Sequence, residues 1–394
     1  PLWVEGFEGE KTVRYFNGDY DHIRIDHNGY MPEINRNNNI MRTKGIFKAT
    51  EPIKPQIIGS LYHPEKTQIF FHPIMNYNIY NKHSYGLKIY NQFLPKGGFA
   101  YKVIPLYSNG TKDFTGEIKL SYKKFSQTAK YHNLTLSVDA RQYLYDYNKE
   151  YTRIMPQLNI EFKKPSLRSK IYKYLNASYV HLVKEEETLG FINAQFGYAN
   201  NRTINPFSGY SSIEKGYNYS KIQLGGFFRK MINQKKQLNI RGYIGYVNTE
   251  DNIYNLKMSA WNGSDDYMFN ERVFSRDNSS NHNLPYQQQY FSREGGLKHF
   301  TNDSLNSSQF LASTYIDYNL LKPISLYAEL GTNGSKIAYG GGFTLNAIAN
   351  GPGFNGGLQL YFPLITEEGV VNFDNYSNVL RFNLYFNLGG LKFD

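Results

Sequence analysis

The final stretch of this 394-residue sequence alternates strictly between two sets of residues. The apolar set is Leu380, Phe382, Leu384, Phe386 and Leu388. The set between them is Arg381, Asn383, Tyr385 and Asn387. A period of two is typical of a β-strand with one apolar face, and about 9–11 residues is the length of one tilted strand across a bilayer. We therefore predict that the first set faces lipid and that the second set faces the lumen of a barrel.

The same alternation recurs along the chain, most clearly at 134–140, 158–162 and 324–330. Soluble β-sandwiches alternate as well, so two further features decide between the classes. Charges and amides occupy the polar positions in mid-strand, and Tyr and Phe, within an aromatic content of 16%, gather at the strand ends. Because a wet lumen and interfacial aromatic girdles have this composition, the pattern favours a transmembrane antiparallel β-barrel over a soluble all-β fold.

The predicted barrel occupies residues 56–394 and has about 14 strands, with 12 or 16 also fitting the pattern and an even number expected. The predicted strands are 68–80, 84–93, 98–108, 113–125, 130–144, 150–163, 170–184, 189–199, 217–230, 237–248, 308–321, 323–331, 353–363 and 379–389. A long polar loop is expected near 249–306, against short turns such as 94–98. A barrel of this size has room for a lumen that is open or partly filled.

Residues 1–55 have a different pattern and are expected to be the tail of an upstream soluble β-domain with a linker. Short strands are predicted at 11–16 and 21–25, a loop at 35–39 and a stiff linker at 51–55. Because the chain begins at Pro1, without Met or an apolar signal segment, we expect it to be a portion of something longer.

Composition excludes several classes of protein. The chain has no Cys, so it has no disulfide framework and no thiolate site, and no apolar run approaches the roughly 20 residues of a helical membrane span. A net charge of +11 is typical of proteins that bind nucleic acid, anionic lipid or polyanionic glycan. Lys and Arg are scattered, and the densest pairs, at 123–124, 163–164 and 235–236, lie near predicted strand ends. A solvated rim is therefore the favoured interpretation, and no nucleic-acid partner is expected.

Several short segments resemble a known family. Residues 3–7, 18–20, 25–26 and 32–38 are similar to the closing β-domain of Bacteroidetes aminopeptidase N-like (gluzincin) zinc metallopeptidases, some of which continue into an outer-membrane barrel. The barrel part is similar too, at 86–91, Pro95, 101–107, 266–267, 287–289 and 361–363. The resemblance implies a bacterial outer-membrane location and a peptidase, with its zinc, only in a domain upstream of this chain. The HExxH motif that such a peptidase needs is absent here, so no catalytic, cofactor or metal residue is predicted.

Three local groups have a possible ligand-binding interpretation and a plainer structural one. His22, Asp26 and His27 are expected to be surface residues around a turn rather than metal ligands. The glycines at 340–342 and 351–353 lack the Lys of a phosphate loop, which favours strand kinks and tight turns. The acidic run 185–187 is expected to be a solvated loop rather than a calcium site.

The function predicted from these features is an outer-membrane barrel that anchors or scaffolds a metallopeptidase-like domain. Two alternatives stay open: an accessory subunit of a larger outer-membrane complex, and a diffusion channel or transporter. The expected partners are outer-membrane lipid, lipopolysaccharide and other outer-membrane proteins. The barrel-assembly machine is expected to recognise the last strand, 380–388, with the late aromatic Phe393.

Overall fold

The computed structural model describes most of the chain. The described residues are 4–6, 8–14, 16, 18–28, 30–31, 39–44, 53–61, 63, 66–92, 98–166, 168–185, 187–233, 236–277, 285–321, 323–351 and 354–388. Several of the residues discussed above lie outside them: 32–38 with most of the predicted loop, 51–52 of the predicted linker, the turn residues 94–97, the second glycine group at 352–353, and the chain end 389–394 with Phe393.

The described residues form strands and short 3-10 helices. The strands are β1 (His22–Arg24), β2 (Ile40–Arg42), β3 (Ile53–Ile57), β4 (Thr67–Asn78), β5 (Lys82–Tyr90), β6 (Gly98–Ser108), β7 (Phe114–Phe125), β8 (Tyr131–Asp146), β9 (Lys149–Phe162), β10 (Ile171–Lys184), β11 (Glu187–Asn200), β12 (Phe207–Lys215), β13 (Tyr219–Met231), β14 (Gln237–Thr249), β15 (Phe310–Leu321), β16 (Ile324–Thr332), β17 (Ile337–Gly351), β18 (Phe354–Thr366), β19 (Gly369–Val370) and β20 (Arg381–Leu388). The 3-10 helices are η2 (Asn252–Tyr254), η3 (Gly263–Asp265), η4 (Pro285–Gln288), η5 (Asp303–Leu305) and η6 (Phe373–Asn378). Within these residues no helix is long and apolar enough to cross a membrane.

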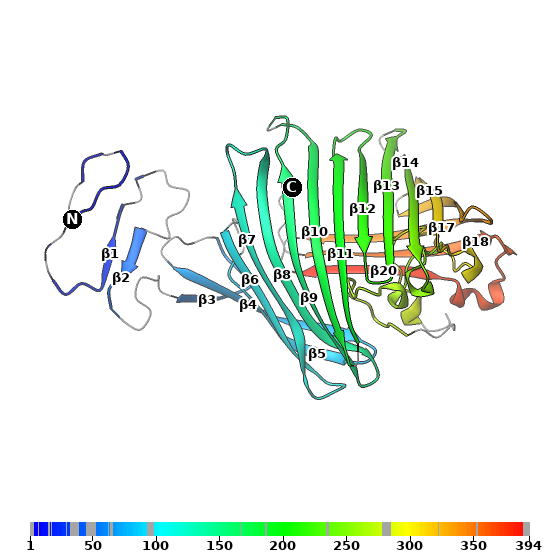
Figure 1. Cartoon of the computed structure of the whole chain (residues 1–394), viewed down its shortest axis with the longest axis horizontal. Coiled ribbons are helices and arrows are strands. Elements are labelled where there is room, and N and C mark those ends of the chain that lie inside the picture. Colours follow the sequence, from blue (N-terminus) through cyan, green and yellow to red (C-terminus); the bar gives the residue numbers. More distant parts are fainter. Residues whose placement is uncertain are drawn as a thin grey trace.

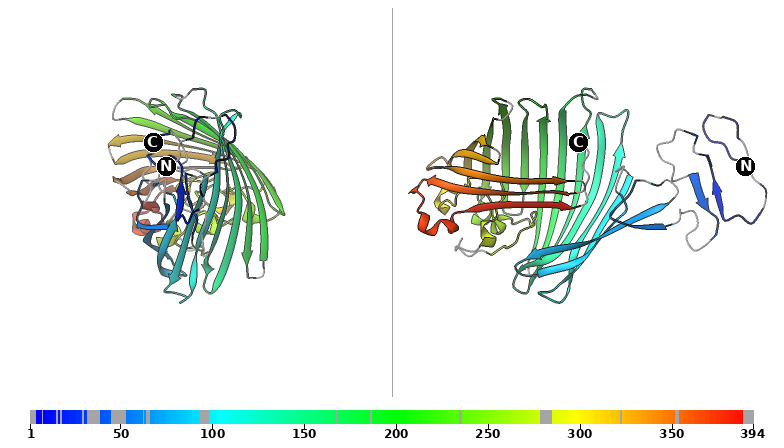
Figure 2. Two further views of the ribbon diagram at one scale, coloured as in Figure 1. Left: turned by 90° about the vertical axis from the view of Figure 1, so that its left-hand side faces the viewer. Right: turned by 180° about the vertical axis from the view of Figure 1, so that it is seen from behind.

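One sheet runs from β3 to β20 and curls into a barrel, with a strand order that returns from β20 to β3. Its long strands pair antiparallel with their neighbours, for example along the whole of β10 and β11, while β3 pairs parallel with the start of β4. In Figure 1, β7 to β14 form one wall, and β15 to β18 with β20 form the opposite wall behind it. A separate sheet of β1 and β2 lies beyond the barrel, on the side of the N-terminus (Figure 2).

The barrel wall has its apolar side chains outside and its polar side chains inside. In β16, exposed Leu326 and Leu330 alternate with buried Ser325, Tyr327 and Glu329. The same inversion holds elsewhere on the wall: Ile118, Leu120, Leu136, Val138, Ile192, Phe196, Ile222, Leu224 and Ile244 are all exposed. A water-soluble sheet buries such side chains instead, so this wall has the polarity of a membrane barrel.

The predicted strands all have counterparts in the sheet, and the observed number exceeds the central prediction of about 14 but lies within the predicted range. Leaving aside the short β3 and β19, sixteen described strands form the wall, which is the upper end of the predicted range. The two strands that the pattern missed are β12 and β17. Small residues interrupt the alternation of β12, and the glycines at 340–342 lie inside β17, where the register with β18 shifts between Gly341 and Gly342.

The first part of the chain also differs from its prediction. Residues 11–14 and 16 form no strand, whereas β1 falls within the predicted strand at 21–25. Residues 53–55, expected to be a linker, belong to β3 and pair with 67–69 in β4. The barrel sheet therefore begins at residue 53, slightly before the predicted boundary.

The two ends of the barrel carry different connections. The turns between β7 and β8, β9 and β10, β11 and β12, and β13 and β14 lie at the end where the chain enters β4 and leaves β20, which we name the terminus end. The long connections from β14 to β15 and from β18 to β20 start from the opposite end, which we name the loop end.

Candidate functional site

The connection between β14 and β15, residues 250–309, fills part of the barrel lumen, and we name it the plug. It carries η2 to η5 and, in its described parts, a set of fully or nearly fully buried apolar side chains. These are Leu256, Met258, Ala260, Tyr267, Met268, Phe269, Tyr290, Leu297 and Leu305. Their burial means that the predicted polar loop is a folded segment packed against the wall.

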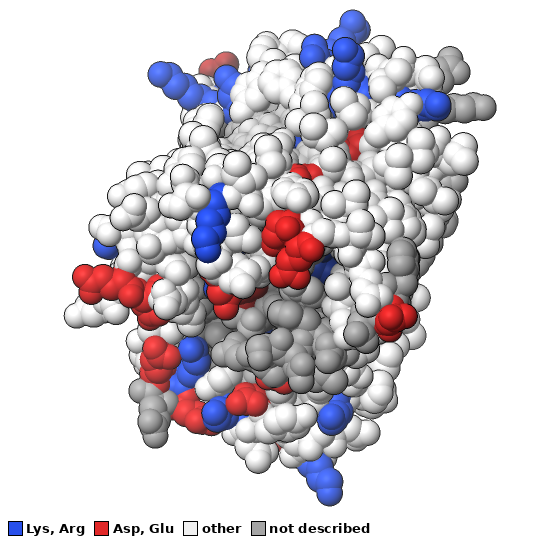
Figure 3. Space-filling view, turned by 90° about the vertical axis from the view of Figure 1, so that its right-hand side faces the viewer, with Lys and Arg blue, Asp and Glu red and all other residues white. Residues whose placement is uncertain are grey.

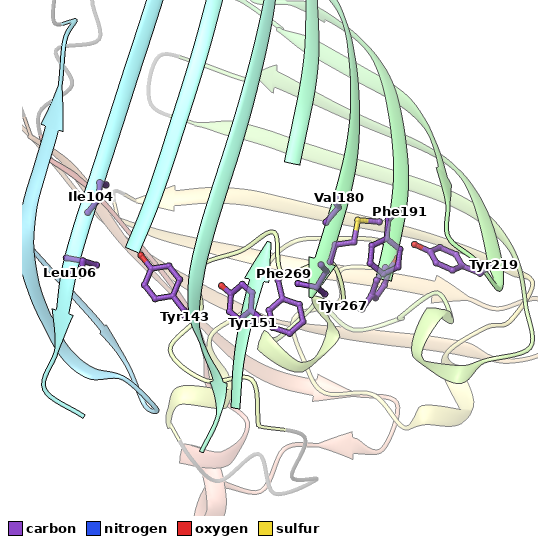
Figure 4. Close-up of a cluster of buried hydrophobic side chains, with 11 residues drawn as sticks. Ile104, Leu106, Tyr143, Tyr151, Val180, Phe191, Tyr219, Tyr267 and Phe269 are labelled. Carbon is purple, nitrogen blue, oxygen red and sulfur yellow. The ribbon is translucent and has the colours of Figure 1, made fainter. Parts of the chain in front are cut away.

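The largest apolar contact joins the plug to the wall that runs from β6 to β13. Figure 4 shows Tyr267 and Phe269 of the plug facing aromatic and aliphatic side chains from several strands. The ring centroid of Phe269 is 4.3 Å from that of Tyr151 in β9, and Tyr267 stacks edge-on to Tyr219 in β13 at 5.7 Å. Such aromatic pairs add to the stabilisation from area burial, so this cluster fixes the plug in one position.

The plug also has an internal framework of its own. The carboxylate of Asp266 accepts hydrogen bonds from the backbone N–H groups of Asn270 and Glu271, and it pairs with Arg276 at 3.0 Å. The Arg276 guanidinium in turn lies 4.1 Å from the ring centroid of Phe269. These contacts close the segment 266–276 on itself and present Phe269 to the wall.

Buried charges hold the plug on one side of the barrel. Lys221 in β13 pairs with Glu294 of the plug at 2.7 Å, and both side chains are almost completely excluded from solvent. Arg153 in β9 pairs with Asp139 in β8 at 3.1 Å and donates to the Asn270 side-chain oxygen of the plug at 2.9 Å. A buried charge is costly unless it is paired and hydrogen-bonded, so these contacts strongly favour the plugged arrangement.

The opposite wall holds the plug through two consecutive residues, Lys298 and His299. The Glu329 carboxylate in β16 accepts from the Lys298 backbone N–H at 2.8 and 2.9 Å and lies 2.9 Å from His299 Nδ1. The other ring nitrogen of His299, Nε2, lies 2.5 Å from Glu367 in the turn after β18. Burial lowers the pKa of His299, but its hydrogen bonds with the two carboxylates outweigh this and raise the pKa to about 9.

The Lys298 ammonium lies among aromatic rings. Its Nζ is 4.9 Å from the ring centroid of Tyr290, 5.2 Å from that of Tyr315 and 5.4 Å from that of Tyr361. It also donates to the Ser292 hydroxyl at 3.1 Å. These rings come from the plug, β15 and β18, so Lys298 ties three separate segments together.

The last strand contacts the plug through Arg381, which has no exposed surface. Its guanidinium donates to the Ala260 carbonyl at 2.8 Å and lies 4.4 Å from the ring centroid of Phe300.

Of the residues predicted to face lipid, Leu380 and Phe382 are half-buried and Leu384 is exposed. Asn383, predicted to face the lumen, is half-buried. The side chains of Tyr385, Phe386, Asn387 and Leu388 lie outside the described set.

A cavity of about 940 Å³ remains beside the plug, between it and the wall from β4 to β9. Cationic side chains from the wall and the plug line it. They are Lys88, Lys102, Arg141, Arg272 and Arg276. Glu117 in β7, adjacent to this cavity, pairs with Lys102 at 3.3 Å, also pairs with Arg272, and accepts from the Tyr143 hydroxyl at 3.2 Å. The lumen is therefore partly filled, and a cavity with both polar and apolar lining residues remains where the plug does not reach.

Plug backbone also pairs with strands at the junction between β20 and the first barrel strands. The N–H of Tyr290 donates to the Phe382 carbonyl at 3.0 Å, and the N–H of Ile79, directly after β4, donates to the Phe274 carbonyl at 2.8 Å. The plug therefore supplies hydrogen bonds to both sides of this junction.

The local groups considered in the sequence have structural roles. The Asp26 carboxylate accepts from the backbone N–H groups of Tyr30 and Met31 in a turn, and His27 lies 3.2 Å from Arg24. Glu187 pairs with Lys184 across the exposed β10–β11 turn. Among the described residues, no group of three His, Asp or Glu side chains converges as a metal site would.

Sequence reasoning missed the residues that hold the plug. It predicted a polar excursion at 249–306 because Asn, Ser and charged residues dominate the segment. The available signal was the apolar triplet at 267–269, which an exposed loop has no reason to carry.

Comparisons with known proteins give distant matches only. No protein-family model and no curated protein matches the chain. Among solved structures, BamA from Haemophilus ducreyi lacking POTRA domains 1–3 has a TM-score of 0.46 and 11% identity over 82% of this chain and 73% of that chain. CdiB from Acinetobacter baumannii has a TM-score of 0.38 and 10% identity over 81% of this chain and 59% of that chain.

Proposed function

We propose that this chain is a bacterial outer-membrane β-barrel that anchors a domain preceding it and keeps its own lumen plugged. The outward apolar wall supports the membrane location, because strand pairing satisfies the backbone while side chains such as Leu224 and Leu326 meet lipid. The observation that favours an anchor over an open channel is the attachment of the plug to both walls, at Lys221 on one side and at Glu329 on the other.

The test is single-channel conductance of the whole chain after folding into a planar bilayer. An anchor with a fixed plug should give no steady open current, whereas a diffusion channel gives stepwise openings. A steady conductance in the unmodified protein would contradict the plugged lumen and favour the channel alternative.

One observation favours the transporter alternative as a second candidate. The cavity beside the plug is large enough for a small solute and is lined by cations such as Arg141 and Lys102. A solute path would run along this side of the lumen. Uptake of small anions into vesicles that contain the folded chain would support that alternative over the anchor.

The nature of the anchored domain rests on the resemblance described above, and we propose that it is metallopeptidase-like. Peptide mass spectrometry of the protein from its native source tests this proposal. Peptides that continue upstream of Pro1 and contain HExxH would support it. Upstream peptides from a different kind of domain would replace it with a scaffold or accessory-subunit role, which a pull-down in mild detergent would then examine.

A further inference from the structure

The turns at the terminus end carry positive charge alone among their described residues. Seven Lys and Arg residues lie in these turns, with no Asp or Glu. They are Lys130, Lys163, Lys164, Arg168, Lys170, Arg202 and Lys236. None of the seven has a carboxylate within ion-pair distance among the described residues. We name this surface the basic rim.

The connections at the loop end, apart from the plug, have the opposite balance. Their described acidic residues are Asp113, Glu185, Glu367, Glu368 and Asp374, against Lys112 and Lys336. In Figure 3, which shows one face, most of the projecting side chains along the upper edge are Lys and Arg, whereas Asp and Glu gather lower down together with further Lys and Arg. The charge of the barrel is therefore polarised along its length.

Aromatic rings lie beside Arg202 of the basic rim and beside two cations, Lys123 and Lys173, on the strand ends next to the rim. Lys123 Nζ lies 5.3 Å from the ring centroid of Phe125, and Lys173 Nζ lies 5.8 Å from that of Tyr198. The guanidinium of Arg202 lies 5.5 Å from the Phe207 ring. Phe125 is 52% exposed and Phe207 is 37% exposed, so these rings stand on the outside of the wall. An exposed ring beside a cation suits the boundary between acyl chains and headgroups.

We propose that the basic rim binds the anionic headgroups of phospholipid in the leaflet at the terminus end. This proposal rests on the membrane location proposed above. A phosphodiester supplies the counter-charge that the seven cations lack in the protein, while the rings fix the depth of the wall. The two longest connections of the barrel, 250–309 and 367–380, lie at the loop end, and outer-membrane barrels have their long loops outside. The basic rim therefore lies on the periplasmic side, where phospholipid is the anion that can surround it, and the acidic loop end lies on the other side.

Lipid selectivity of the folded chain tests the proposal. The whole chain is folded into phosphatidylcholine vesicles, and electron spin resonance measures the association of spin-labelled phosphatidylglycerol relative to spin-labelled phosphatidylcholine. We expect a preference for phosphatidylglycerol of roughly fivefold for each engaged cation, and this preference should weaken as salt is added. Equal association of the two lipids would overturn the proposal.

Two matched variants test whether the preference for phosphatidylglycerol arises at the basic rim. The rim variant carries Lys163→Gln, Lys164→Gln, Arg168→Gln and Lys170→Gln, and it should lose most of the preference. The control carries Lys112→Gln, Lys149→Gln, Lys215→Gln and Lys336→Gln at the loop end, and it should keep the preference. The same loss in both variants would overturn the assignment to the rim, because net charge alone would then explain the result.

A third arm separates phospholipid from the other anionic lipid of this membrane. Unlabelled phosphatidylglycerol and unlabelled lipid A compete for the site, and stronger competition by lipid A would overturn the choice of phospholipid. Failure of the unmodified chain to fold into any vesicle would instead contradict the proposed membrane barrel, and the two failures are therefore distinguishable.

Discussion

Lys221 of β13 and Glu294 of the plug form an ion pair of 2.7 Å with almost no solvent contact on either side chain. Glu294 also accepts a hydrogen bond from the Lys257 backbone N–H. The pair therefore couples a wall strand to two separate parts of the plug. Removing one member leaves a buried charge without its partner, which costs far more than the net contribution of the intact pair.

Lys221→Met should lower the free energy of unfolding by about 3–5 kcal/mol, because Glu294 stays buried without its counter-charge. The measurement is urea unfolding of the barrel in vesicles, followed by tyrosine fluorescence. The double variant Lys221→Met with Glu294→Gln should recover part of the loss. An equal loss in the single and double variants would show that the charge pairing is not the cause.

His299→Gln should change how the stability of the plug depends on pH. Because the folded pKa of His299 is raised to about 9 from an ordinary 6.5, its contribution is fully present below pH 6.5 and is lost as pH rises through 9. The difference in urea midpoint between the unmodified chain and His299→Gln should therefore shrink between pH 6.5 and 9.

Other charged groups surround His299, so the comparison of the unmodified chain with His299→Gln has to separate the effect of His299 from theirs. Glu329 and Glu367 contact its ring, and Lys298 precedes it in the chain. Burial and the nearby Arg241 lower the pKa of Lys298 to about 7, which favours the plug as pH rises and so acts in the opposite direction. Lys298 is present in both proteins, so their difference isolates His299. A constant difference across this pH range would refute the role of His299 in holding the plug.

Leu224→Lys should destabilise the barrel by about 2–4 kcal/mol, because Leu224 is 51% exposed in the middle of β13 and would place a charge at mid-depth in lipid. The matched control is Tyr217→Lys, at a fully exposed turn residue, where the expected cost is about 0–1 kcal/mol. Unfolding titrations in vesicles compare the two. Similar costs at both positions would mean that the outer wall is not surrounded by lipid.

Phe269→Ala should loosen the plug without unfolding the wall. The substitution removes the ring that packs on Tyr151 and Arg276, at a cost of about 3–5 kcal/mol for a buried aromatic. We expect intermittent current in planar bilayers where the unmodified chain gives none. Phe125→Ala, on the outside of the wall, is the control and should stay closed.

The wall was predictable from sequence because lipid on one side and water on the other impose a strict period of two. Strands such as β16, with Leu326 and Leu330 outward and Glu329 inward, show this pattern clearly. The sequence pattern did not predict β17, because its three consecutive glycines carry no alternating side chains. Gly342 is required there by close backbone packing, because a Cβ at this position would lie 2.0 Å from the Phe362 carbonyl oxygen.

The plug was not predictable by the same reasoning, because it packs against both apolar and polar side chains of the wall. Lys221 and Glu294 are 73 residues apart in the chain, and neither carries a local signal that it will be buried. Polar residues in this segment pair with polar residues of the wall, so composition resembles that of an exposed loop. The partners of Asn270, Glu294 and His299 lie on β9, β13 and β16, and they become apparent once the plug is placed inside the lumen.

The plug lies between strands made before it and strands made after it in the chain. It contacts Arg153 and Lys221 from the earlier wall, and Glu329 and Arg381 from the later one. Because Glu329 and Arg381 contact plug residues, we expect the plug to seat before the later strands reach their final places. The plug would then direct the assembly of the second half of the barrel. A substitution that disrupts the plug should therefore appear first as slow or incomplete assembly of the last strands.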